Sequence, residues 1–203
     1  MSRKVEPMKA KKEDRRVQRT RQLLSQALLA LIPEKGFDAV TVQDVIDRAN
    51  VGRSTFYTHF VDKEDLLVQA MDPFSAHLKE RQRKALSRGG PSDEGAFAFS
   101  RELFSHAEGH RDVFRAMVGK QSAVILQRHF QRMQVELVRE ELRAMAPRAA
   151  NSAVPPEAVV QFLASALYGL LAWWMDGKMR LSVDEVNDLF KRMAVPAVKA
   201  AFR

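Results

Sequence analysis

The stretch from Thr41 to Leu66 constrains the fold more than any other part of the chain, because it has the pattern of two short helices separated by a tight turn. Thr41 followed three residues later by Asp44 is a capping-box pattern, which predicts that the first helix begins at Thr41. Asn50 tolerates the left-handed conformation that a tight turn needs. The apolar positions of this helix have the spacing of a single helix face and are Val42, Val45, Ile46 and Ala49. The stretch therefore predicts a helix-turn-helix, a layout that binds DNA.

The second short helix is expected to follow Gly52, an acceptable N-cap residue, and to be about two turns long. Phe56 and Phe60 fall on one face of it and would anchor the helix in a core. Arg53 can reach guanine or phosphate. Small hydroxyl side chains that can follow base edges point away from the anchoring face, and these are Ser54, Thr55 and Thr58. Side chains that suit phosphate oxygens are Tyr57, His59 and Lys63.

The run VGRSTFYTHFVDKEDLL is similar to the recognition-helix signature of the TetR (tetracycline-repressor-like) family of transcriptional regulators. The upstream run ALLALIPEKGFDAVTVQDVIDRA resembles the helices that precede that signature in the family. The resemblance covers roughly the first third of the chain. It implies that the backbone-positioning contacts to DNA are Thr41, Tyr57, His59 and Lys63, and that the groove-facing residues are Arg53, Ser54, Thr55 and Thr58. The chain departs from the family pattern at Asn50 and Gly52, where the family usually has Gly and Ser.

The charge of the chain agrees with a polyanionic partner, since 203 residues carry a formal charge of +8 and the sequence pI is near 10.0. Residues 1–14 are read as a basic arm that either follows phosphates and the minor groove or is a solvated, disordered terminus. The basic residues ahead of the first apolar periodicity are Lys4, Lys9, Lys11, Lys12, Arg15, Arg16, Arg19 and Arg21. Cysteine is absent, which excludes disulfides and thiolate sites. The basic N-terminus is not followed by an apolar segment, so it does not have the pattern of a signal peptide, and a cytoplasmic location is expected.

The apolar pattern is helical nearly throughout, so the sequence predicts an all-α protein with a three-helix head at 15–62 and a helical effector-binding and dimerisation domain at 63–203. The first helix is expected from Arg15 to Lys35, ended by Gly36. A long helix from Asp62 to Ser87, kinked at Pro73, would follow the head. Further helices are expected at 93–107, 111–118, 122–145, 156–176 and 182–201.

The segment from Ala158 to Met175 is apolar enough to raise the question of a membrane span, but Gln161 and Ser165 interrupt it and it stands alone. A helix that is apolar all round is equally expected where it is buried against a partner. In TetR-like proteins the last two helices pair with their copies in a four-helix dimer interface, which this segment and 182–201 resemble. A two-fold dimer predicts double-stranded operator DNA with a (pseudo)palindromic sequence as the partner.

A small-molecule effector is the remaining expectation that the resemblance carries, and no motif marks its site. Residues that could line a cavity between helices are Phe97, Phe104, Met117, Phe130, Phe162, Tyr168 and Trp173, although each could equally belong to the core or the dimer interface. His106 and His110 have metal-ligand spacing but no third ligand, so we expect neither a metal nor another cofactor. No catalytic constellation stands out and we expect no enzyme. A helical protein-interaction module without specific DNA binding remains the alternative.

Overall fold

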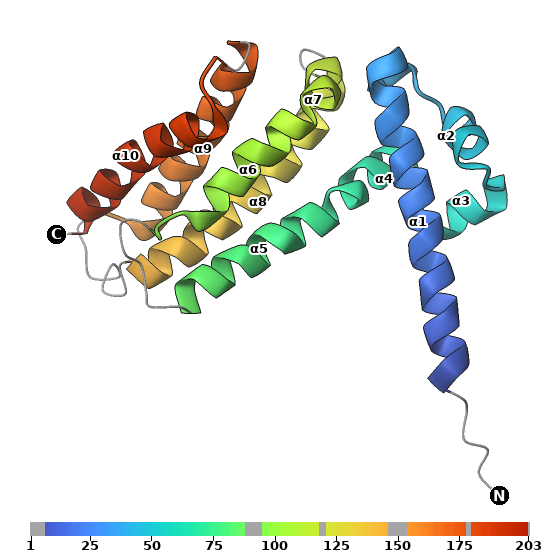
Figure 1. Cartoon of the computed structure of the whole chain (residues 1–203), viewed down its shortest axis with the longest axis horizontal. Helices are drawn as coiled ribbons and strands as arrows, with labels where there is room; N and C mark the ends of the chain where they lie inside the picture. The colour runs from blue at the N-terminus through green and yellow to red at the C-terminus, as the bar shows by residue number, and fades with distance from the viewer. Residues whose placement is uncertain (1–6, 88–94, 118–120, 146–153, 178–179, 203) are drawn as a thin grey trace, which may run out of the picture. The chain divides into compact units, whose positions relative to one another are not determined.

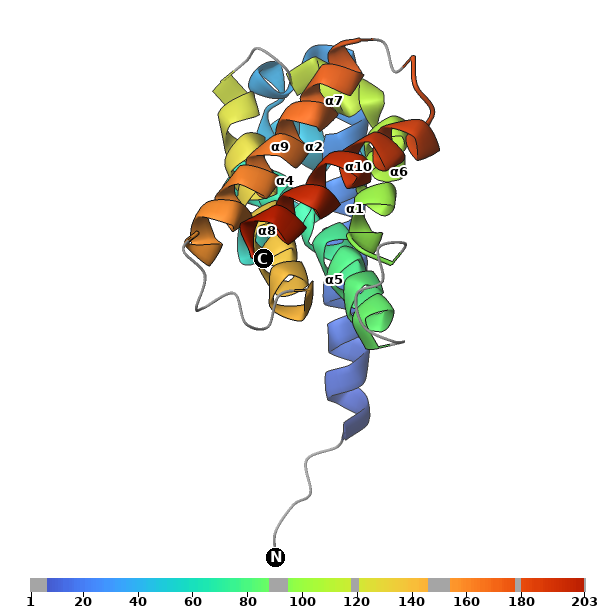
Figure 2. The same ribbon diagram turned by 90° about the vertical axis from the view of Figure 1, so that its left-hand side faces the viewer.

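The computed structural model describes residues 7–87, 95–117, 121–145, 154–177 and 180–202, except for the side chains of residues 7–14, 117, 121–123 and 125–126. The described residues form helices and contain no strand (Figures 1 and 2), as an all-α protein requires. The chain divides into two compact units. The N-terminal unit comprises residues 1–71 with 115–123, and the C-terminal unit comprises 72–114 with 124–203.

The N-terminal unit contains α1 (Pro7–Lys35), the short 3-10 helix η1 (Phe37–Ala39), α2 (Val42–Ala49), α3 (Arg53–His59) and α4 (Lys63–Ala70). The start of α1 differs from the predicted start at Arg15. The segment before Arg15 is rich in Lys and Glu, which favour a helix, and Pro is well suited to a first helical position. The arm predicted at 1–14 is therefore helical from Pro7, and residues 1–6 lie outside the described residues.

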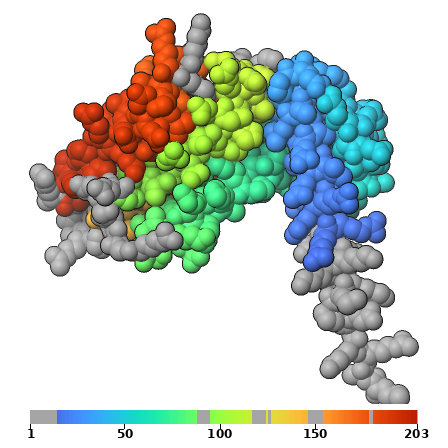
Figure 3. All heavy atoms as spheres, viewed as in Figure 1, coloured from blue at the N-terminus to red at the C-terminus, as the bar shows by residue number. Residues whose placement is uncertain are grey.

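The core of the N-terminal unit forms where α1 packs against α2 and α4. The α1 residues expected to be buried are buried, and these are Leu24, Ala27, Leu28, Leu31 and Ile32. Val45 from α2 and Leu66 from α4 are fully buried with them. Burial of each large apolar side chain contributes about 1.5–3 kcal/mol. Figure 3 shows α2 and α3, in cyan, lying directly against α1, in blue.

The end of α1 follows the prediction. Pro33 lies inside the helix, which continues to Lys35. Gly36 then adopts φ 76°, a left-handed conformation that costs glycine little, and its N–H donates to the carbonyl of Ile32 over 2.8 Å. The chain reverses here into η1, which brings α2 back against α1.

The long helix predicted from Asp62 to Ser87 is wrong. The structure has two helices instead, α4 and α5 (Asp72–Ser87), which are separated at Met71. Pro73 has no N–H to donate to the carbonyl of Gln69, so a continuous helix would lose a hydrogen bond there and its ring would collide with the preceding turn. The proline therefore falls in the first turn of a new helix, where a missing donor matters least.

The C-terminal unit contains α5, α6 (Ala98–Gly109), α9 (Pro156–Asp176), α10 (Val183–Ala201) and most of α8 (Gln121–Met145). The division between the units falls within α7 (Arg111–Met117) and again near the start of α8. Most bounds agree with the predicted ranges, but α6 begins at Ala98 rather than at 93. Phe97 precedes it with φ 53°, a left-handed conformation that does not continue a helix. The helices α9 and α10 lie side by side (Figure 2).

Aromatic side chains fill the core of the C-terminal unit. Phe104 of α6 packs edge-on against Trp174 of α9, with ring centroids 5.7 Å apart. Phe97 packs in the same way against Phe190 of α10 at 5.4 Å. These four rings are at most 2% exposed, so they join α6 to both C-terminal helices.

A polar network crosses this apolar core. Gln82 of α5 donates from Nε2 to Oε2 of Glu141 and to the carbonyl of Leu137, over 2.8 and 2.7 Å. The backbone N–H of Phe97 donates to the other carboxylate oxygen of Glu141 over 2.7 Å. Gln82 and Glu141 are nearly fully buried, and burial raises the pKa of Glu141 above its usual range, against the lowering effect of its hydrogen bonds. The network ties α5 and the start of α6 to α8.

Candidate nucleic-acid interface

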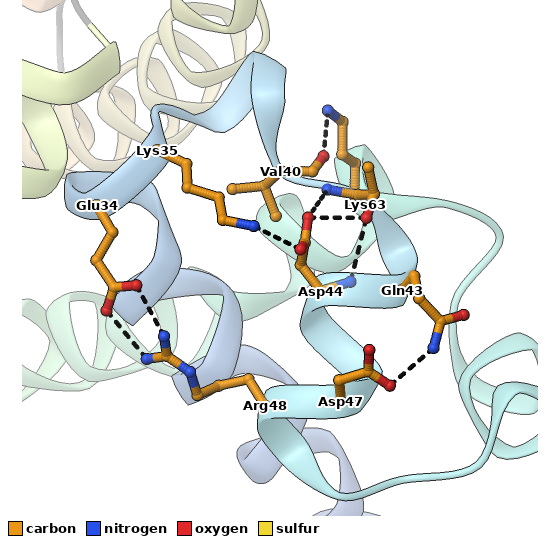
Figure 4. A network of polar contacts seen from close by, with 9 residues as sticks. Glu34, Lys35, Val40, Gln43, Asp44, Asp47, Arg48 and Lys63 are labelled. Atoms are coloured by element: carbon orange, nitrogen blue, oxygen red, sulfur yellow. Dashed lines mark hydrogen bonds and ion pairs between the residues drawn. The ribbon is translucent and has the colours of Figure 1, made fainter.

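The first helix of the predicted helix-turn-helix is capped as expected. The Oγ1 of Thr41 accepts from the backbone N–H of Asp44 over 3.1 Å, and the N–H and hydroxyl of Thr41 donate to Oδ2 of Asp44 over 2.9 and 2.8 Å. Lys35 donates to Oδ1 of Asp44 over 2.5 Å (Figure 4). The Lys35 ammonium, followed by the Thr41 hydrogen bonds, holds the pKa of Asp44 well below its usual range. Asp44 is therefore ionised and α2 begins at a defined residue.

The turn between the two helices has the geometry that Asn50 was predicted to supply. Asn50 adopts φ 51° and ψ 50°, a left-handed conformation that asparagine tolerates better than most residues. Val51 then donates its N–H to the carbonyl of Ile46 over 3.0 Å, which closes the end of α2. Gly52 is the N-cap of α3, and a Cβ there would meet nothing nearer than Oγ1 of Thr55 at 3.8 Å. The backbone therefore keeps the expected turn despite both departures from the family pattern.

The helix α3 has one buried and one exposed face. Phe56 and Phe60 are at most 3% exposed and their rings lie 5.8 Å apart. Tyr57 is 53% exposed, and its ring rests edge-on against Phe56 at 5.3 Å. The polar residues on the remaining surface are Arg53, Ser54 and Thr58, which are exposed, and Thr55 and His59, which are half-buried. Six of the eight predicted residues thus lie on one helix anchored from behind by two phenylalanines, whereas Thr41 caps α2 and Lys63 begins α4.

The hydroxyl of Thr58 already has a hydrogen bond, since it donates to the carbonyl of Ser54 over 2.9 Å. This leaves its oxygen lone pairs and its methyl group toward solvent. Such an arrangement suits contact with a donor on a base edge or with a thymine methyl.

Lys63 has a structural contact that sequence reasoning missed. Its ammonium donates to the carbonyls of Phe37, Asp38 and Val40 over 3.0, 3.1 and 2.8 Å, and it lies 4.7 Å from the centre of the Phe37 ring. Three N–H donors meet three carbonyls, so Lys63 fastens the start of α4 to η1 and to the residue that follows it. Figure 4 shows the contact with Val40. No local pattern marks the contact, because its partners lie more than twenty residues earlier in the chain.

Two ion pairs between α1 and α2 were also missed. Arg48 donates from both Nη atoms to the carboxylate of Glu34 over 3.0 and 2.7 Å, and Lys35 pairs with Asp44 as described above (Figure 4). Each pair is largely exposed, so each contributes little stability alone. The planar two-point contact of Arg48 does restrict how α2 can turn on α1.

The predicted effector residues do not come together. Phe97, Phe104 and Phe130 are buried in ring contacts of the C-terminal unit, the last with Phe114 at 5.2 Å. Phe162 and Trp173 are 62% and 56% exposed on α9. Tyr168 is half-buried, and the side chain of Met117 lies outside the described residues. The predicted residues therefore include three packed phenylalanines and an exposed pair, Phe162 and Trp173. The placement of an effector among them stays a prediction.

The two histidines with metal-ligand spacing, at which no metal was expected, lie against each other and against an aromatic ring. The rings of His106 and His110 lie 4.2 Å apart, and Phe74 of α5 stacks on His106 at 3.6 Å. Burial, and then the neighbouring His110, lower the pKa of His106 to about 4, so this ring is neutral at physiological pH. Within the part of the chain that the structure describes, no three metal-ligating side chains come together.

The structure thus has a capped helix, a left-handed turn and an anchored helix with an exposed polar face. This arrangement defines a helix-turn-helix DNA-binding protein. Comparison with known families agrees with it. Residues 24–70 match the model of the bacterial regulatory proteins of the tetR family, and residues 95–195 match that of a transcriptional regulator C-terminal region. The chain belongs to the TetR family of transcriptional regulators, as the sequence predicted.

Individual relatives resemble the chain in sequence over part of its length, or in fold over most of it. An uncharacterised helix-turn-helix transcriptional regulator, YxbF of Bacillus subtilis, is 43% identical over 60 residues, which are 29% of this chain and 16% of that protein. A TetR regulator structure from Streptococcus agalactiae is 26% identical, with a TM-score of 0.63 over 91% of this chain and 98% of that one. A TetR-family structure from Syntrophomonas wolfei has a TM-score of 0.72 at 19% identity, over 89% and 95% of the two chains. FadR from Thermus thermophilus, solved with lauroyl-CoA, has a TM-score of 0.66 at 20% identity, over 86% and 93%.

Proposed function

We propose that the protein is a homodimeric repressor that binds a (pseudo)palindromic operator through α2 and α3 and leaves it when a small molecule binds the C-terminal unit. The observation that carries the DNA-binding part is the polar face of α3, exposed over the buried anchors Phe56 and Phe60. Arg53, Ser54, Thr55 and Thr58 would face the base edges, and Thr41, Tyr57 and His59 would position the phosphate backbone. Lys63 would join them only by giving up hydrogen bonds to the carbonyls that it contacts in this structure. A protein that acts on DNA in this way works in the cytoplasm.

The exposed face of α9 supports the homodimer. Phe162 and Trp173 are mostly exposed there, and Met193 on the adjacent α10 is 53% exposed. Between the two aromatic residues lie Ser165 and Gly169, whose small size permits close approach of another helix. By length and composition α9 could cross a membrane, and a little less than half of it is buried within one chain. A second copy covering this face accounts for an apolar helix that its own chain leaves half uncovered.

The effector part rests on the family and on one neighbour. FadR of Thermus thermophilus is a TetR-family repressor with lauroyl-CoA bound. We place the effector of this chain in the C-terminal unit, among the residues predicted from the sequence. An effector can release DNA only if it binds one conformation of the dimer more tightly than the operator-bound one.

The decisive experiment is selection of duplexes from a random DNA library by the purified full-length protein, compared with Tyr57→Ala. An enriched palindrome that the variant no longer enriches is the expected result. The matched control is His77→Ala, which removes an exposed ring from α5 of the C-terminal unit. No enrichment by a folded wild-type protein would contradict operator binding and favour the protein-interaction alternative.

The dimer is tested separately by sedimentation of Trp173→Glu. A buried carboxylate at the proposed interface is expected to give monomers, while the helix content is retained because the site is exposed in a single chain. Val61→Glu is the matched control, because Val61 is 79% exposed in the N-terminal unit, and it should leave the dimer intact. A Trp173→Glu protein that remains dimeric would refute this interface.

A further inference from the structure

Gln43, on the exposed side of α2, joins two side chains of opposite charge. Its Nε2 donates to Oδ1 of Asp47 over 2.7 Å (Figure 4). Its Oε1 accepts from Nη2 of Arg53 over 2.9 Å. Arg53 is the first residue of α3 and is one of the predicted groove-facing residues. A side chain of α2 thus forms a hydrogen bond with the first residue of α3, the recognition helix.

The two charges determine which way the Gln43 amide points. Its oxygen can only accept and its NH₂ group can only donate, so the oxygen faces the guanidinium and the NH₂ group faces the carboxylate. Turning the amide over would set donor against donor at Arg53 and acceptor against acceptor at Asp47. The orientation is therefore imposed from both ends, and Asp47 braces the amide that holds Arg53.

This contact leaves Arg53 able to read a base. A guanidinium has five N–H donors, and Gln43 uses one of them. The donors that remain include a parallel pair, which matches the O6 and N7 acceptors of guanine in the major groove. Residues at the start of a recognition helix are the ones that contact base edges. Arg53 therefore meets DNA with part of its side-chain freedom already removed.

We propose that Gln43, braced by Asp47, is a positioning residue that orients Arg53 to select a guanine at one position of each operator half-site. The inference rests on the operator binding proposed above. Restricting a long side chain before binding avoids an entropy loss equivalent to about 2- to 10-fold in affinity. Asp47 has a second effect, since its negative charge beside the interface weakens binding to DNA of every sequence.

The test uses the full-length protein with Gln43→Ala, Arg53→Ala and both changes together. Each is titrated against the selected operator and against operators changed at one base pair. Arg53→Ala is expected to lose the preference at one guanine. Gln43→Ala is expected to weaken the preference at the same base by about 2- to 10-fold, with the salt dependence unchanged. The double variant should match Arg53→Ala, because Gln43 acts only through Arg53.

Two further variants sharpen the test. Gln69 of α4 donates to Asp65 over 2.9 Å, so Gln69→Ala removes a comparable glutamine–aspartate pair with no link to Arg53, and base preference should not change. Asp47→Asn removes the bracing charge, and is expected to strengthen binding to unrelated duplexes while weakening the guanine preference.

Three results would overturn the proposal. An additive effect in the double variant, or a changed preference at another base, would mean that Gln43 reads DNA by itself. An unchanged base preference in Gln43→Ala would mean that the contact does not orient Arg53 on DNA. If the folded wild-type protein enriches no sequence, operator binding is refuted and this inference fails with it. If the wild-type protein enriches an operator and Gln43→Ala keeps the same base preference, only this inference is refuted.

Discussion

Two buried glutamines of the C-terminal unit should respond in opposite ways to the same substitution. Gln82 is 3% exposed and its Nε2 donates to Glu141 and to the carbonyl of Leu137. Gln134 is fully buried, and neither atom of its amide has a hydrogen-bond partner among the described residues. Methionine keeps the unbranched shape of glutamine and removes the amide. Gln82→Met and Gln134→Met therefore differ mainly in the hydrogen bonds that they remove.

The magnitudes follow from those bonds. Gln82→Met loses a hydrogen bond to a charged group, worth about 1.5–3 kcal/mol, and one to a neutral carbonyl, worth about 1 kcal/mol. Burial of the apolar methionine side chain offsets part of this loss, so we expect the free energy of unfolding to fall by about 2–3 kcal/mol. Gln134→Met removes an amide whose unpaired burial costs about 1–3 kcal/mol, so we expect it to be neutral or stabilising.

The assay is urea unfolding followed by far-UV circular dichroism at a single protein concentration, because the stability of the proposed dimer would depend on concentration. With an unfolding slope of about 2–3 kcal/mol per molar urea, Gln82→Met should lower the midpoint by about 1 M. Equal destabilisation by the two variants would refute the reasoning, since it would show that Gln134 also has partners in the folded protein.

Three further predictions concern single residues. Thr41→Ala should destabilise the N-terminal unit by about 1 kcal/mol in thermal unfolding through loss of the α2 cap, and an unchanged midpoint would contradict the capping role. Lys63→Met should cost about 1–2 kcal/mol, because the carbonyls of η1 lose a charged donor in a partly exposed site; a variant of wild-type stability would show that Lys63 is free to contact phosphate instead. The raised pKa of Glu141 means that the folded state binds more protons above the unfolded value of 4.5, so this residue's contribution to stability falls as pH rises from there. The stability of Glu141→Gln relative to wild type should therefore rise as the pH is raised from about 4.5 in urea titrations, and a parallel pH dependence would contradict the raised pKa.

Features that depend on neighbours along the chain could be predicted from the amino-acid sequence. The cap at Thr41, the left-handed Asn50 and the buried stripe of α1 follow from spacing and from the conformations that each residue type tolerates. The polar face of α3 follows in the same way, because Phe56 and Phe60 define the opposite face of a short helix. The same local patterns gave the family and hence the class of function. Pro73 indicates an interruption near Met71, but spacing alone does not tell one kinked helix from two separate helices.

Contacts between side chains of different elements could not be predicted in this way, because they depend on the packing of the folded chain. Lys63 reaches the carbonyls of η1, and Gln43 reaches Arg53, through contacts that depend on where separate helices lie in space. The same holds for the burial of Glu141 and for the division of the predicted effector residues into packed rings and the exposed pair Phe162 and Trp173. Periodicity gives the face on which a residue lies, but the element that covers this face is set by the packing of the whole unit.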